Sequence, residues 1–344
     1  MTCKIYCLWT FFLFLPYLLF CNENKPLVIA TNTILADIAF QLAGDEARVV
    51  SLVPLGMDPH NFDPSPADIK LTASADLILT NGLNLESWLL SLIKRTGYSI
   101  PTDTVTLGIQ PILTGKYESV VDPHAWLDPL LGIMYVKNTE RSLSNLLPHY
   151  RETIEFNSRV MQEELLNIHN YTIEKLNDIP PEQRILITSH DAFRYFGQRY
   201  GLVVKSVFPS SPDAEITVKD MAALSQVIQQ SGVKAIFPES TINPRIVNQI
   251  ASDNQLILGG KLYSDSLSEP GKGAPDYISM LYHNANQIYN GLTGKRTAVT
   301  NSSLAHGDNN TNLYLTLFVA LVLLGSFVLM WYKLNFTPAV LPKD

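Results

Sequence analysis

The sequence predicts an α/β protein with two lobes, each a parallel sheet covered by helices, joined by one long rigid helix and followed by a C-terminal transmembrane helix. Three observations support this fold class. Strand-like and helix-like runs alternate along residues 26–293, which is typical of parallel sheets. Residues 150–179 contain neither Pro nor Gly, and residues 313–332 are uncharged over the length of a membrane span.

The N-terminal lobe is expected over residues 26–149. One helix start within it is well marked: Ser65 is a good N-cap, Pro66 suits the first turn, and Asp68 is the acid at the third position. The expected strands are 27–31, 48–54 and 77–82, and the expected helices are 33–42, the one beginning at Ser65, and 85–93.

The C-terminal lobe is expected over residues 180–293, with the same alternation of element types. Its expected strands are 184–190, 203–209, 234–240 and 255–260, and its expected helices are 193–200, 218–230, 244–252 and 275–292.

Between the lobes, residues 150–179 read as one helix that Pro148 precedes and Pro180-Pro181 ends. Such a helix is about 45 Å long, so it would join the lobes as a stiff rod. A coiled-coil partner helix is the alternative, but the apolar spacing is not heptad-regular.

The N-terminal segment reads as an export signal over residues 1–23, because Lys4 precedes an apolar run that ends at Phe20. Cys21 follows this run as in a bacterial lipobox, although Phe20 stands where a small residue is usual. Cleavage elsewhere near residues 20–24, or a first transmembrane helix, are the alternatives.

The C-terminal segment reads as a polar stalk (294–312) and a transmembrane helix (313–332) with aromatic residues at its edges. A buried core helix is the alternative for 313–332. Lys333 follows the span, and no Lys or Arg lies directly before it. The positive-inside rule therefore places the C-terminus in the cytoplasm and the body on the extracytoplasmic face of the membrane.

Charge and cysteine usage exclude several functions. The net charge is −7 without a Lys/Arg block, which argues against a nucleic-acid partner. All three cysteines (Cys3, Cys7 and Cys21) lie in or at the export signal. An exported body would therefore have no disulfide, no thiolate chemistry and no Cys metal ligand.

Three of the seven histidines share a context typical of ligands. His60, His124 and His190 each lie after a strand or in a loop before a helix, where open parallel sheets bind ligands. His60 and His124 both occur in Asp-Pro-His, with a second Asp-Pro shortly after. Proline stiffens such loops, and imidazole is the commonest ligand of divalent metals. The remaining histidines, to which we assign solvated or packing roles, are His149, His169, His283 and His306.

A metal site of this kind also needs a carboxylate. Glu239 and Asp265 both follow strand-like runs in the C-terminal lobe, and the residues alone leave the choice between them open. Four other acids neighbour the histidines and could orient their second ring nitrogens: Asp58, Asp122, Asp128 and Asp191.

Five stretches occur in the order found in one known family: GMDPHNFDPSPADI, DPHAWLDP, TSHDAFRYFGQRYGL, IFPES and LYSDSL. With the long central helix, they make residues 26–293 resemble the substrate-binding proteins of zinc/manganese/iron ABC importers (cluster A-I). The resemblance implies His60 and His124 as ligands from the N-terminal lobe, and His190 and Asp265 from the C-terminal lobe. Glu239 is a second choice near the metal. A C-terminal transmembrane helix departs from the family, whose members are mostly soluble or lipid-anchored.

The metal stays open between Zn²⁺, Mn²⁺ and Fe²⁺. Three imidazoles and one carboxylate suit tetrahedral zinc, whereas a bidentate Asp265 would supply five ligand atoms and suit manganese or ferrous iron. Relatives with Glu at position 190 are typically manganese binders. Many zinc members carry a His-rich loop, which residues 110–121 lack.

The resemblance implies a monomeric, non-enzymatic protein that captures one such ion between its lobes, and the two chain ends predict that this protein is tethered to the membrane. It would deliver the ion to an importer's permease and, through the permease, to the ATPase subunits. A zinc-dependent metallohydrolase with Glu239 as general base is the alternative, although no His-Glu-x-x-His motif is present. A surface adhesin is a third reading.

Overall fold

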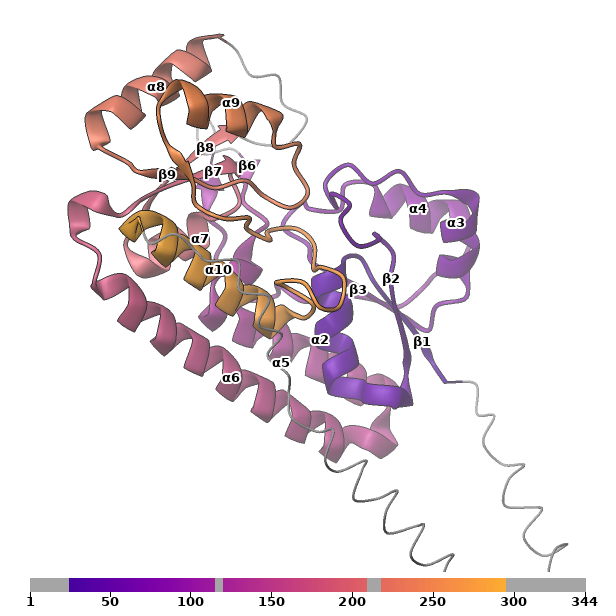
Figure 1. Ribbon diagram of the computed structural model, residues 1–344. Coiled ribbons are helices and arrows are strands. Elements are labelled where there is room, and N and C mark those ends of the chain that lie inside the picture. The colour runs from indigo at the N-terminus through magenta and orange to yellow at the C-terminus, as the bar shows by residue number, and fades with distance from the viewer. Residues whose placement is uncertain (1–24, 115–119, 209–217, 295–344) are drawn as a thin grey trace, which may run out of the picture. The chain divides into compact units, whose positions relative to one another are not determined.

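The computed structural model describes residues 25–114, 120–208 and 218–294, all within one compact unit (Figure 1). Its α-helices are α2 (Thr33–Ala43), α3 (Pro66–Ala73), α4 (Leu89–Thr96), α5 (Pro129–Leu146), α6 (Arg151–Asn177), α7 (Arg194–Tyr200), α8 (Val218–Ser231), α9 (Arg245–Asp253) and α10 (Tyr277–Thr293). Its strands are β1 (Leu27–Ala30), β2 (Arg48–Ser51), β3 (Leu77–Thr80), β4 (Thr102–Thr104), β5 (Leu113–Thr114), β6 (Val120–Val121), β7 (Ile185–His190), β8 (Val203–Phe208), β9 (Ala235–Ile236) and β10 (Ile257–Leu258).

The N-terminal half contains a parallel sheet in the order β2-β1-β3-β4. Successive residues of β1 serve opposite faces, as the pleat requires. Val28 and Ala30 join the large core with α2, α5 and α6, whereas Leu27 and Ile29 pack with side chains of α3 and α4. The sheet is therefore covered on both faces, which explains why its central strands are continuously apolar.

The C-terminal half repeats this arrangement. β7 pairs with β8 and β9 with β10, all parallel, and a bridge between Thr188 and Phe237 links the two pairs. Ile187 and Ile236 pack with α8 and α9, whereas Leu186 and Phe237 join the large core with α10. The predicted α/β fold with parallel sheets covered by helices is confirmed.

The long helix predicted over 150–179 is α6, which is 27 residues long, or about 40 Å. Figure 1 shows α6 running along α2, α5 and α10, and its buried apolar residues belong to one core that contains both Val28 and Phe237. Because this core is continuous from one half to the other, α6 is packed along its length and is not a free linker.

Several elements differ from the expectations. Helix α5 was not predicted from the sequence, although Asp128 caps its N-terminus by accepting a hydrogen bond from the Leu130 amide, and Pro129 occupies its first turn. β4 was also missed, because Thr102–Thr104 is polar and only partly buried. The helix start at Ser65 is confirmed, with both hydrogen bonds of a capping box to Asp68.

The predicted segments at the chain ends lie outside the described residues. These are the export signal with Cys21, the stalk beyond residue 294, and the transmembrane helix at 313–332. Within the described ranges, no helix has both the length and the apolarity needed to cross a membrane.

Two neighbours on α6 test how much the shared core stabilises the fold. Leu165 is fully buried, whereas Leu166 is 46% exposed. We expect Leu165→Ala to lower the free energy of unfolding by about 2–5 kcal/mol, because it leaves a cavity in the core. Leu166→Ala should change it by less than about 0.5 kcal/mol. Urea unfolding of both variants measures the change in the free energy of unfolding. Equal changes would contradict the conclusion that Leu165 packs in the shared core and Leu166 does not.

Asp37 of α2 makes the stability pH-dependent. Its Oδ2 accepts a hydrogen bond from the Tyr277 amide at the start of α10, and burial raises the pKa of this carboxyl to about 6. Because this pKa lies above the unfolded value, the folded state binds more protons between about pH 4 and 6. The contribution of Asp37 to the free energy of unfolding is therefore fully present at low pH. As pH rises through about 6, the free energy of unfolding falls by up to about 3 kcal/mol because of this group.

We expect Asp37→Asn to remove this loss, since an amide oxygen can still accept from Tyr277 and does not ionise. Denaturant unfolding at a series of pH values checks this, with exposed Asp45→Asn as the control. If the free energy of unfolding changes with pH in the same way for the wild-type protein and Asp37→Asn, the carboxyl of Asp37 does not contribute to the pH dependence of stability.

Candidate metal centre

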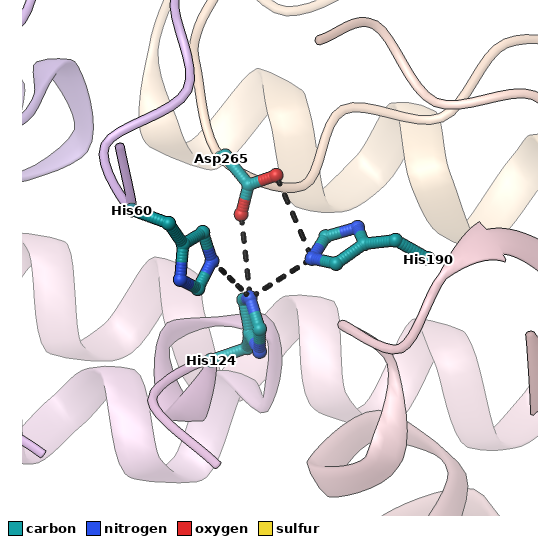
Figure 2. Close-up of side chains that lie close together, drawn as sticks. All are labelled: His60, His124, His190 and Asp265. Atoms are coloured by element: carbon teal, nitrogen blue, oxygen red, sulfur yellow. Dashed lines mark hydrogen bonds and ion pairs between the residues drawn. The ribbon is translucent and has the colours of Figure 1, made fainter. Parts of the chain in front are cut away.

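Four side chains that are far apart in the sequence meet at one point. Figure 2 shows His60, His124, His190 and Asp265 turned toward one another, and each offers one ligand atom within 4.8 Å of the others. His60 Nε2 and His190 Nε2 lie 3.1 and 3.2 Å from His124 Nε2. All but His60 are buried.

The two Asp-Pro-His motifs adopt the same local structure. Asp58 Oδ1 accepts a hydrogen bond from the His60 amide at 2.8 Å, and Asp122 Oδ1 accepts one from the His124 amide at 2.9 Å. Each motif is thus an Asx turn, in which the Asp side chain replaces a backbone acceptor. This turn fixes the backbone from which each imidazole projects.

The proline carbonyl in the middle of each motif is also held. Pro59 O accepts a hydrogen bond from Trp88 Nε1 at 2.9 Å, and Pro123 O accepts one from Asn81 Nδ2 at 3.2 Å. Asn81 is fixed in turn, because Tyr135 donates to its side-chain oxygen. Both loops are therefore attached to the N-terminal half by side-chain donors.

Two of the rings are oriented by buried carboxylates. His124 Nδ1 lies 2.8 Å from Asp122 Oδ1, and His190 Nδ1 lies 2.8 Å from Glu239 Oε2. Because a carboxylate can only accept, Nδ1 carries the proton in both rings. When neutral, a ring protonated at Nδ1 presents the Nε2 lone pair to the cluster, which is the arrangement that metal-binding histidines need.

His190 is the last residue of β7, so the strand itself directs this ring. Glu239, the second choice for a ligand, lies behind His190, and its other oxygen accepts the His190 amide at 2.7 Å. Both carboxylate oxygens of Glu239 are thus engaged with His190.

Asp265 supplies the carboxylate of the cluster. Its Oδ1 is buried, has no hydrogen-bond partner among the described residues, and lies 3.4 Å from His124 Nε2. A buried carboxylate oxygen without a donor is costly. A cation among the three rings would satisfy it, so the residues fit a divalent metal.

The charges of the cluster favour a cation. Burial raises the pKa of Asp265, but His190 and His124 outweigh burial and hold this pKa well below its usual range. Burial lowers the pKa of His124, but Asp122 and Asp265 outweigh it and raise the value to about 10. Burial and then His124 lower the pKa of His60 to about 4. The carboxylates that hold a proton on His124 attract a metal cation for the same reason.

The segment that carries Asp265 is bonded to the N-terminal half. Trp126 Nε1 donates to Ser264 O at 2.7 Å, the Gly56 amide to Ser266 Oγ at 2.7 Å, and the Leu267 amide to Thr33 Oγ1 at 2.9 Å. Asp265 is thus placed opposite the histidines by contacts on both of its sides.

The other acids near the histidines divide by role. Asp122 orients a ring as expected, and Asp58 contacts the His60 backbone. Asp128 and Asp191 instead pair with Arg199 and Arg194.

Trp88, Asn81 and Trp126 have roles that were not predicted from the sequence. Each acts on a segment distant in the sequence, and no local motif indicates this. Trp126 lies in the DPHAWLDP stretch, two residues after His124, but its partner is 138 residues away.

Three imidazoles and one carboxylate, on loops and at a strand end of an α/β fold, are the donor set of a divalent transition-metal site. Within the described ranges, His60, His124, His190 and Asp265 are the side chains whose donor atoms lie close enough together to hold one metal ion. Fold and site together define the class, a metal-binding protein.

Comparisons with known proteins identify the family. Residues 28–291 match the family model "Zinc-uptake complex component A periplasmic". The manganese ABC transporter substrate-binding lipoprotein PsaA of Streptococcus pneumoniae is 34% identical over 279 residues, covering 79% of this chain and 90% of that protein. The metal ABC transporter substrate-binding lipoprotein SloC of Streptococcus mutans is 32% identical, covering 79% and 91%.

Solved structures agree. The periplasmic zinc-binding protein TroA of Treponema pallidum superimposes with a TM-score of 0.74 at 32% identity, covering 78% of this chain and 99% of that one. The manganese-bound periplasmic metal-binding protein of Candidatus Liberibacter asiaticus gives 0.72 at 29% identity, covering 78% and 100%.

The chain therefore belongs to the family of zinc-uptake complex component A. This confirms the resemblance found in the sequence and the prediction that the chain is a substrate-binding protein of a metal ABC importer and not an enzyme.

The orienting carboxylates give a test of the site. In Asp122→Asn the amide can donate to Nδ1, which would place the His124 proton on Nε2, where it opposes a metal. We expect metal affinity to fall about 10–100-fold, as measured by calorimetry. Asp191→Asn is the control, because Asp191 follows His190 and pairs with Arg194. Equal effects of both variants would contradict the orienting role.

Proposed function

We propose that this chain captures one Zn²⁺, Mn²⁺ or Fe²⁺ ion outside the cytoplasmic membrane and delivers it to the permease of an ABC importer. His60, His124, His190 and Asp265 are the ligands in this proposal. The observation that carries it is the convergence of their four ligand atoms within 4.8 Å in a buried site. Imidazole nitrogens together with a carboxylate oxygen are a donor set that suits divalent transition metals.

The ligands come equally from the two halves of the chain, which we propose act as two lobes joined by α6. His60 and His124 belong to the N-terminal half, and His190 and Asp265 to the C-terminal half. The continuous core along α6 and the hydrogen bonds around Ser264 oppose a wide hinge opening. Release would then use a small displacement of a loop, such as the one that carries the partly exposed His60.

Delivery requires the protein to stay near its permease. We propose that it is tethered at the extracytoplasmic face of the membrane, by the apolar segment at 313–332 or by lipid on Cys21. The relatives PsaA and SloC are lipoproteins, which supports a tether of some kind. The protein would act as a monomer, with the permease and its ATPase subunits as partners.

The alternatives are not favoured. A metallohydrolase needs an available general base, but both Glu239 oxygens accept from His190. The family consists of solute-binding proteins, and nothing in the site points to adhesion.

Calorimetry of the purified protein with Zn²⁺, Mn²⁺ and Fe²⁺ tests the proposal. We expect one ion per chain for the wild type. His60→Ala should lower the metal affinity by more than the roughly 100-fold that removal of an orienting partner costs, because this substitution removes a donor atom. The exposed His149→Ala should bind as the wild type does. A wild type that binds none of the three ions, or a His60→Ala variant that binds them as tightly, would refute it.

A further inference from the structure

We propose that Tyr195 is a positioning residue for metal binding, which links the helix that follows His190 to the loop that carries His124. This inference rests on the proposed function and deepens it. It concerns two rings that come from different halves of the chain and whose Nε2 atoms lie 3.2 Å apart. A metal ion bound by both rings requires them to keep one fixed position relative to each other.

Tyr195 belongs to α7, in the C-terminal half. This helix begins at Arg194, four residues after His190, so Tyr195 is close in sequence to one of the ligands. The residue is only 4% exposed, and burial raises the pKa of its hydroxyl to about 12. The hydroxyl therefore keeps its proton at neutral pH and can donate a hydrogen bond.

The hydroxyl of Tyr195 contacts two backbone segments of the N-terminal half. Tyr195 Oη donates to the Asp122 carbonyl at 2.9 Å and accepts from the Ile112 amide at 3.0 Å. These two segments are also joined to each other, because the Asp122 amide donates to the Ile112 carbonyl at 2.9 Å. One hydroxyl thus attaches both segments to α7.

Asp122 is the residue through which this contact reaches the metal site. Its Oδ1 accepts from the His124 amide and lies 2.8 Å from His124 Nδ1, so a shift of Asp122 would change the direction of the ring. On the other side of His124, Asp128 pairs with Arg199, which lies one turn after Tyr195 on α7, at 2.8 Å. Helix α7 therefore holds the His124 loop both before and after the ligand.

The surroundings of the Asp122 segment give it little other support. The chain reaches Asp122 from the short hairpin of β5 and β6, in which Leu113 is 48% and Val120 is 46% exposed. A cavity of about 400 Å³ lies against Ile112 and Tyr195, and a cavity offers no atoms for packing. The hydrogen bonds of the hydroxyl therefore carry much of the attachment of this segment to α7.

The test is Tyr195→Phe, which removes one oxygen atom and retains the ring. The Asp122 segment then loses its attachment to α7, and the ring of His124 loses its fixed direction. We expect the affinity for Zn²⁺ and for Mn²⁺ to fall about 10-fold, the lower end of what the outer partners of a metal ligand contribute. Calorimetry of the purified protein with each ion measures the change.

Tyr200→Phe is the matched control, because it makes the same substitution on the same helix at a residue that is 6% exposed. The hydroxyl of Tyr200 lies 3.2 Å from Nδ1 of His169, which is not a candidate ligand. We expect both variants to lower the free energy of unfolding in urea to a similar extent, since each loses a buried hydroxyl contact. Only Tyr195→Phe should lose metal affinity, and equal affinities of the two variants would overturn the inference.

A double-mutant cycle with Asp122→Ala separates positioning from a general loss of structure. Asp122→Ala removes the side chain through which Tyr195 acts on His124. In this background, Tyr195→Phe should lower the metal affinity by less than about 3-fold, because residues that act through one another are not additive. The same loss in both backgrounds would overturn the inference. A wild-type protein that binds none of the ions would instead refute the proposed function.

Discussion

Two buried pairs of imidazole and carboxylate are the constraint on which the rest of the site depends. Asp122 holds His124, and Glu239 holds His190. Each pair fixes the position of a proton and the direction of a ring, and each adds a negative charge that attracts a cation. Burying such charges is unfavourable unless they are paired. The surrounding fold must therefore hold these groups rigidly, and the hydrogen bonds around the three histidines and Asp265 do so.

The N-terminal half supplies rigidity through its loops. The Asx turns of both Asp-Pro-His motifs set the backbone, and Trp88 and Asn81 attach the proline carbonyls to the N-terminal half. The C-terminal half supplies it differently, since His190 ends a strand of the parallel sheet. Asp265 lies on an irregular segment that is held by the N-terminal half, so neither half completes the site alone.

Much of this could be predicted from the sequence, because the signals are local. The alternation of apolar runs predicts the parallel sheets, and the absence of Pro and Gly predicts α6. The matched contexts of the three histidines single them out from the seven. Signals that were present but overlooked are also local: Asp128-Pro129 marks the start of α5. β4 carries no such signal, because a short polar strand is defined by its neighbour in the sheet and not by its own residues.

The sequence by itself determined the family and the fold class, through the order of its motifs and the alternation of its elements, and it singled out three histidines; Asp265 entered as a ligand only through the resemblance. Only the tertiary structure decided what each oxygen and nitrogen of the site does. Glu239 and Asp265 were equal candidates as residues, but Glu239 has both oxygens engaged by His190, whereas Asp265 keeps one oxygen without a donor. The physical reason is that hydrogen bonds between distant segments, such as Trp126 to Ser264, depend on chain packing, which no local pattern encodes.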